Sequence, residues 1–131
     1  MEAKIKQCEA QVLVVDDDVS VRSFLRRGLS LEGYAVEEAE TGEQGLELAQ
    51  LHRPDLIVLD LMLPQMDGFQ TLSALRAHGL DCPVILLSAD DSAETRRSVA
   101  NLGITDFMVK PISFAALTEQ IEQLLRGKAL N

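Results

Sequence analysis

Polar side chains stand at the ends of four apolar runs of this chain. Asp16 and Asp17 directly follow the first run, and Asp60 ends the second. Ser88 ends the third run, and Lys110 follows the fourth. If the runs are parallel strands of one sheet, their carboxyl ends meet at one edge, where such sheets bind ligands. The sequence therefore predicts a pocket that gathers carboxylates, a hydroxyl and an ammonium group.

This set of groups suits the binding of a divalent cation and the acceptance of a phosphoryl group. Carboxylates are hard oxygen donors of the kind that Mg²⁺ (or Mn²⁺) prefers, and Mg²⁺ needs few protein ligands. A carboxylate can also attack phosphorus, and phosphoryl transfer depends mainly on positioning and charge neutralisation. We therefore predict Asp16, Asp17 and Asp60 as metal ligands, Asp60 as nucleophile, and Lys110 and Ser88 as partners of the phosphoryl oxygens.

Each of these residues also has an ordinary structural explanation. Acidic residues cap helices, and Asp18 is expected to do so. Asp60 could be a cap or a solvated loop residue, Lys110 could extend its ammonium group to solvent, and hydroxyl residues such as Ser88 often end strands. One cap does not need three acids in a row, however, and adjacent like charges are costly without a cation. The coincidence of five such residues at strand ends favours a site.

The elements that must position these residues alternate along the chain. Strands are predicted over residues 11–16, 35–39, 55–60, 83–88 and 105–110, and helices over 20–32, 41–51, 69–77, 92–102 and 113–126. The first, third and fourth strands are continuous apolar runs, as expected for strands covered on both faces. The fold class is therefore predicted to be α/β, a (βα)5 doubly wound sheet of five parallel strands.

Helical periodicity predicts which helix faces point inward. On the helix 20–32 the predicted inner residues are Val21, Phe24, Leu25, Gly28 and Leu29. The helix 92–102, which Gly103 should end, carries few apolar residues, so its attachment should be weak and it should shift easily.

Composition limits the classes of function. The chain has 131 residues, 47% of them hydrophobic, enough for one domain with a core. The formal net charge of −9 repels phosphates, so no nucleic acid partner is expected. No membrane span or signal peptide is apparent, which predicts a cytoplasmic location without membrane contact. Residues 11–126 are predicted to form the domain, after a flexible extension (1–10) and before a tail or linker start (127–131).

Several short motifs accompany these site residues. They are Val14-Val-Asp-Asp-Asp18, Asp60 with Pro64 and Met66-Asp-Gly68, Leu87-Ser-Ala89, and Lys110-Pro111. In these motifs, and over about residues 12–125, the chain closely resembles the receiver domain of two-component response regulators. The resemblance implies a flavodoxin-like strand order, 2-1-3-4-5.

The resemblance also implies roles for individual residues. Asp60 would be the phosphoacceptor. Asp17 would bind Mg²⁺ directly, Asp16 partly through water, and Met62 through its backbone carbonyl. Two further implications are that Ser88 and Phe107 form the switch pair and that the Lys110–Pro111 bond is cis.

The implied partners are proteins. The phosphoryl donor would be a phosphohistidine on a sensor histidine kinase or a histidine phosphotransfer protein. The face made by the helix 92–102, the strand 105–110 and the helix 113–126 would change on phosphorylation and contact an output domain or an effector protein. The domain would be a switch rather than an enzyme, with only self-catalysed phosphorylation and dephosphorylation.

Other functions compete with this one. A receiver that interacts with proteins without phosphorylation would keep the fold but accept no phosphate. An aspartate-nucleophile phosphatase of the haloacid dehalogenase type would need a second acid two residues after Asp60, where Met62 stands. Flavodoxin-like cofactor binding would need a phosphate-binding loop after the first strand, where three aspartates would repel phosphate.

Overall fold

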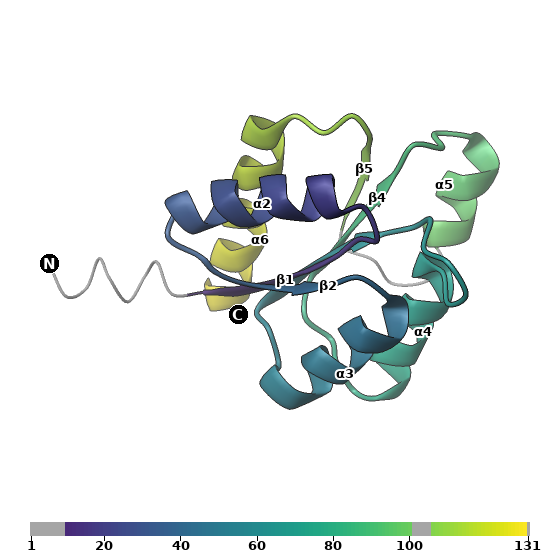
Figure 1. Cartoon of the computed structure of the whole chain (residues 1–131), viewed down its shortest axis with the longest axis horizontal. Coiled ribbons are helices and arrows are strands. Elements are labelled where there is room, and N and C mark those ends of the chain that lie inside the picture. Colours follow the sequence, from purple (N-terminus) through teal and green to yellow (C-terminus); the bar gives the residue numbers. More distant parts are fainter. Residues whose placement is uncertain (1–9, 101–105, 131) are drawn as a thin grey trace, which may run out of the picture.

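A computed structural model describes residues 10–100 and 106–130 of the chain as a sheet with helices on both faces (Figure 1). The strands are β1 (Gln11–Val15), β2 (Ala35–Ala39), β3 (Leu56–Asp60), β4 (Val84–Ser88) and β5 (Asp106–Val109). The helices are α2 (Val19–Leu31), α3 (Gly42–His52), α4 (Gly68–Ala77), α5 (Ala93–Ala100) and α6 (Phe114–Leu130). The predicted alternation of strands and helices is confirmed.

Within the described residues, the sheet has five strands in the order β2-β1-β3-β4-β5, and every adjacent pair is parallel. This confirms the predicted doubly wound topology and the order 2-1-3-4-5. β3 lies at the centre, between β1 and β4, and all five of its residues are buried. Because the strands are parallel, the residues at their carboxyl ends lie along the same edge.

Alternate residues of the central strands pack on opposite faces of the sheet. Leu13, Ile57 and Leu86 belong to a core cluster that includes residues of α3, α4 and α5. The intervening residues, among them Val14 and Val58, belong to a second cluster with residues of α2 and α6. Figure 1 shows α2 and α6 on one side of the sheet and α3 and α4 on the other. Burial on both faces explains why these strands read as unbroken apolar runs.

Side-chain caps begin the helices in the described part of the chain, and those of α2, α3 and α4 lie at the ends of loops from the sheet. Ser92 and Ser113 accept hydrogen bonds from amides in the first turns of α5 and α6. Asp18 accepts hydrogen bonds from the backbone amides of Ser20 and Val21 at the start of α2, so its predicted capping role is confirmed. Thr41 caps α3, and Asp67 forms a reciprocal capping box with Gln70 at α4. These caps fix where each helix leaves the site edge of the sheet.

The prediction that Phe24 points into the core is wrong. Its side chain is 55% exposed, and its ring packs edge to face against Phe114 with 5.7 Å between the centroids. The Phe114 ring lies over Gly28, so a Cβ at position 28 would collide with it. Leu25 and Leu29, by contrast, are buried as predicted. Phe24 therefore lies at the edge of the buried face of α2. Helical periodicity alone does not distinguish this edge from the core.

The end of the last helix also differs from the prediction. The last helix was expected to end at Arg126, but α6 continues to Leu130. α5 spans Ala93–Ala100 with Val99 as its buried residue, which agrees with the predicted weak attachment of this helix. The predicted stop at Gly103 and the flexible extension over residues 1–9 lie outside the described residues. Across the described chain, no helix combines the length and apolarity that crossing a membrane requires.

Candidate functional site

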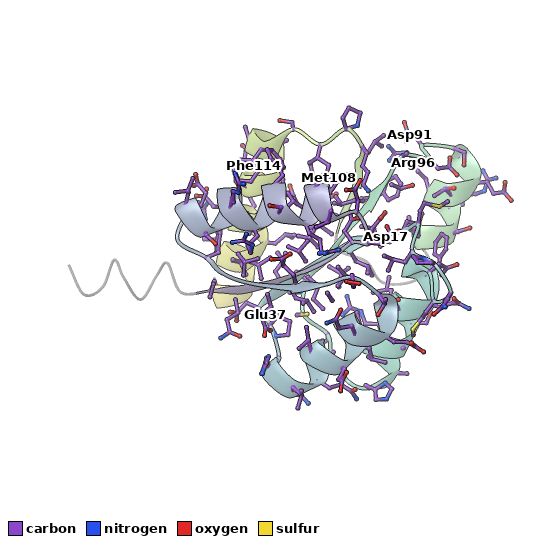
Figure 2. All side chains as sticks on the ribbon, in the orientation of Figure 1. Asp17, Glu37, Asp91, Arg96, Met108 and Phe114 are labelled. Carbon is purple, nitrogen blue, oxygen red and sulfur yellow. The ribbon has the colours of Figure 1, made fainter. Side chains whose placement is uncertain are left out.

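The carboxylates of Asp16, Asp17 and Asp60 come together at the carboxyl edge of the sheet. They each offer an oxygen, and these oxygens lie within 4.8 Å of one another. Asp16 and Asp60 are buried at 1% and 3% exposure, whereas Asp17 is exposed. Figure 2 labels Asp17 at this end of the molecule. Three hard oxygen donors in mutual reach, one of them open to solvent, fit a divalent cation that retains some of its waters.

Lys110 connects two of these acids. Its Nζ atom lies 3.3 Å from Asp16 Oδ2 and 3.4 Å from Asp60 Oδ2. The desolvation that comes with partial burial works against the charged ammonium, but the carboxylates of Asp16 and Asp60 outweigh it and raise the pKa of Lys110. Its backbone amide donates a hydrogen bond of 2.8 Å to the carbonyl of Ser88, and the bond to Pro111 is cis, as predicted.

Asp60 is buried beside a like charge. Desolvation and the Asp16 carboxylate raise its pKa above the ordinary value of 3.8. Two groups oppose that rise, because Lys110 is nearby and the Met62 amide donates a hydrogen bond of 3.1 Å to Asp60 Oδ1. The pair of buried carboxylates is therefore held together at an electrostatic cost that a cation would relieve.

Asp16 is fixed through its backbone as well as its carboxylate. Its amide donates to the carbonyl of Ala39 on β2 at 3.1 Å, and its Oδ1 atom accepts from the amide of Asp18 at 2.9 Å. Its own carbonyl oxygen accepts a hydrogen bond of 2.7 Å from Nη1 of Arg22, on the first turn of α2. Sequence reasoning missed Arg22, because an arginine on a helix gives no signal of the backbone group it will reach.

Ser88 is fully buried and bonded to its own loop. Its Oγ atom accepts a hydrogen bond of 2.9 Å from the amide of Asp90 and lies 3.3 Å from that residue's carbonyl. Ser88 pairs with Val109 of β5, while the neighbouring Leu87 pairs with Asp60. The hydroxyl therefore lies on the strand next to Asp60, and its role toward a phosphoryl group stays a prediction.

Phe107 is half-buried on β5 and packs against the core cluster on the α3 and α4 side. The guanidinium carbon of Arg96, on α5, lies 5.0 Å from the centre of its ring. Arg96 also pairs with Asp91 at 2.5 Å, and Figure 2 shows these two labelled residues side by side. The predicted switch residue therefore has a cation over its ring, which the sequence did not indicate.

A cleft of about 480 Å³ opens beside the acids. Its lining residues include Asp17, Met62 and Asp90, and the Met62 side chain is 67% exposed. Thr95 Oγ1 donates a hydrogen bond of 2.7 Å to Asp90, which lowers the pKa of that carboxyl. The cleft therefore borders the acid cluster at Asp17. The role of the Met62 carbonyl stays a prediction.

Comparison with known proteins decides the family. Residues 12–122 match the family model of the response regulator receiver domain. The chain belongs to this family. Curated relatives of this receiver domain include the response regulator MprA of Mycolicibacterium vanbaalenii and that of Mycobacterium leprae, each 42% identical over 116 residues and 88% of this chain. The chain spans about half the length of these relatives, 50% and 51% respectively.

Solved structures agree with the receiver fold. The chemotaxis protein CheY4 of Vibrio cholerae matches with a TM-score of 0.84 and 32% identity, covering 88% of this chain and 98% of that one. The receiver domain of the Francisella response regulator 1452 matches with a TM-score of 0.87 and 32% identity, covering 92% and 99%. The receiver domain thus occupies nearly all of the chain.

Proposed function

We propose that this receiver domain accepts a phosphoryl group from a phosphohistidine donor onto Asp60 in a reaction that depends on Mg²⁺ (or Mn²⁺). The observation that carries the proposal is the grouping of Asp16, Asp17 and Asp60 within 4.8 Å, with Lys110 between two of them. An acid cluster alone is common. Here a buried nucleophile, a counterion and an open cleft accompany it.

Asp16, Asp17, Asp60 and the backbone carbonyl of Met62 would hold the metal. When bound, Mg²⁺ would neutralise part of the charge on the phosphoryl oxygens and relieve the repulsion between Asp16 and Asp60. The donor set supports this assignment, since it consists of oxygens and carries a formal charge of −3 that Lys110 only partly balances.

The chain's own residues would carry out the transfer. A carboxylate oxygen of Asp60 attacks phosphorus, the new P–O bond forms as the P–N bond to the donor imidazole breaks, and the imidazole keeps the electron pair and takes up a proton. Lys110 would bind one phosphoryl oxygen, and the Ser88 hydroxyl would bind another after leaving Asp90. The same site would hydrolyse the acyl phosphate slowly, so the domain acts as a phosphoacceptor switch and not as an enzyme.

Movement of Ser88 toward the phosphoryl group would vacate space for the Phe107 ring. This exchange would alter the face formed by α5, β5 and α6, which would then contact an output domain or an effector protein. The donor would be a sensor histidine kinase or a histidine phosphotransfer protein. The phosphoryl group of phosphohistidine comes from ATP, so the reaction would take place in the cytoplasm. Residues 11–126 would act there as one receiver unit.

Mass spectrometry after incubation with acetyl phosphate and Mg²⁺ tests the proposal. The wild-type chain should gain the mass of one phosphoryl group, and Asp60→Asn should gain none. Chelation of the metal should also prevent the gain. A wild-type chain that accepts no phosphate from acetyl phosphate or a phosphohistidine protein would instead be a phosphorylation-independent interaction module. Rapid turnover of a phosphomonoester would favour the phosphatase.

A further inference from the structure

Arg22, on α2, connects the loop of residues 16–18, here called the acid loop, to β2. Its side chain is only 12% exposed, and Nη1 donates a hydrogen bond of 2.7 Å to the carbonyl oxygen of Asp16. Its Nε atom lies 3.3 Å from Oε1 of Glu38 on β2. The planar guanidinium group can make both contacts at once, so it holds the strand end that carries Asp16 against β2.

Arg26, one turn further along α2, shares this partner. Its Nε atom lies 2.7 Å from the other carboxylate oxygen of Glu38, and its side chain is 46% exposed. Within the described residues, its ion pair is with Glu38 and not with Asp16. The two arginines therefore carry the same charge and bind the same carboxylate, but Arg22 alone of the pair reaches the acid loop.

We propose that Arg22 is a positioning residue for the cation site, which it serves by fixing the backbone of Asp16. The inference rests on the proposed metal binding at Asp16, Asp17 and Asp60. Residues that orient metal ligands typically change metal affinity by about 10–100-fold when they are replaced. Arg22 would do so through the main chain, since it binds the carbonyl and not the carboxylate of Asp16.

Charge alone predicts the opposite effect. A guanidinium group near the acids repels a divalent cation, so its removal should tighten metal binding if Arg22 acted only through space. Loss of positioning should weaken binding, because Asp16 would then sample arrangements that do not suit the ion. The direction of the change therefore separates the two explanations.

The experiment measures Mn²⁺ affinity by electron paramagnetic resonance in the full chain. Arg22→Gln should weaken Mn²⁺ binding about tenfold, whereas Arg26→Gln, with the same change of charge, should bind Mn²⁺ like the wild type. Arg22→Lys keeps the charge but cannot make both contacts, and it should also weaken binding.

In acetyl phosphate labelling, Arg22→Gln should need more Mg²⁺ for half-maximal rate and should approach the wild-type rate at saturating Mg²⁺. A merely structural defect would lower that maximal rate.

Different outcomes would overturn the inference and the proposed function. Arg22→Gln could bind Mn²⁺ as well as or better than Arg26→Gln. If Arg22→Gln does not fold, Arg22→Lys takes its place in the test. An affinity for Mn²⁺ equal to that of the wild type in Arg22→Lys would then overturn the inference. A wild type that binds Mn²⁺ but is never phosphorylated would contradict the proposed function and leave the Arg22 result standing. A wild type that binds no Mn²⁺ would contradict both.

Discussion

Asp60, the proposed nucleophile, is a carboxylate whose ionised form the fold disfavours. Burial and the neighbouring Asp16 raise its pKa, while Lys110 and the Met62 amide lower it without cancelling the rise. The ionised carboxylate is therefore less favourable in the folded chain than in the unfolded chain. The proposed function requires the ionised form of Asp60, because a protonated acid would neither attack phosphorus nor bind a cation.

Asp60→Asn should consequently stabilise the metal-free domain at pH 7. A raised folded-state pKa means that the folded chain binds more protons, so wild-type stability falls as pH rises from the unfolded value of 3.8 through the higher folded value. The variant lacks this loss. Thermal unfolding without metal should show a higher Tm for Asp60→Asn at pH 7 and a difference that shrinks toward pH 3.

Asp81→Asn provides the control, because Asp81 is an exposed carboxylate on the same chain. Its Tm should follow that of the wild type at both pH values. A lower Tm for Asp60→Asn than for the wild type at pH 7 would contradict the prediction. It would show that the contacts of Asp60 with Lys110 and Met62 stabilise the fold by more than the burial of its charge costs.

At the scale of elements, β3 is the support of the site. It is the central strand, it ends in Asp60, and Leu59 is fully buried in the core cluster on the α3 and α4 side. Leu59→Ala should lower the free energy of unfolding by about 2–5 kcal/mol, because it leaves a cavity that the neighbouring strands cannot fill. Urea denaturation measures this loss.

Leu51→Ala makes the same chemical change at a side chain that is 68% exposed on α3. It should alter the free energy of unfolding by less than about 0.5 kcal/mol. If both variants lost the same free energy of unfolding, burial in β3 would not explain the loss in Leu59→Ala.

α5 is held to the sheet by few side chains. Val99 is its buried residue, and Arg96 contacts Asp91 and the ring of Phe107. Arg96→Met keeps an unbranched stem but loses the charge, so it should speed amide hydrogen exchange in α5. It should lower the free energy of unfolding by no more than about 1 kcal/mol, because the ion pair is exposed.

Arg97→Met is the matched variant, since Arg97 is an exposed neighbour on the same helix. Exchange in its α5 should resemble that of the wild type, and exchange in β3 should be unchanged in both variants. Acceleration in Arg97→Met as large as in Arg96→Met would attribute the effect to helix composition and not to the contact with Phe107.

The contrast between strands and helices explains what the sequence could predict. Strands buried on both faces appear as apolar runs, so β3 and the polar residue that ends it were predictable without coordinates. The rim position of Phe24 and the reach of Arg22 depend on how two elements pack and on side-chain rotamers. Local periodicity carries neither kind of information.

At the scale of the whole molecule, the acid cluster is part of a general excess of negative charge. The formal net charge is −9, so added cations should stabilise the compact chain by screening as well as by specific binding. A ligand that binds only the folded state at 100 times its Kd adds about 2.7 kcal/mol to the free energy of unfolding. Specific binding of Mg²⁺ should therefore raise the Tm of the whole domain.

Thermal unfolding in MgCl₂, compared with NaCl at equal ionic strength, separates the two effects. Both salts should raise the Tm of the wild type. MgCl₂ should raise it further, because an ion at the proposed ligands Asp16, Asp17 and Asp60 would connect the carboxyl ends of the adjacent strands β1 and β3. In Asp17→Asn the two salts should act alike, since Asp17 is a proposed ligand and its exposed side chain can be replaced without disturbing the core. Equal effects of the two salts on the wild type would reduce the role of Mg²⁺ to screening and remove the metal from the mechanism.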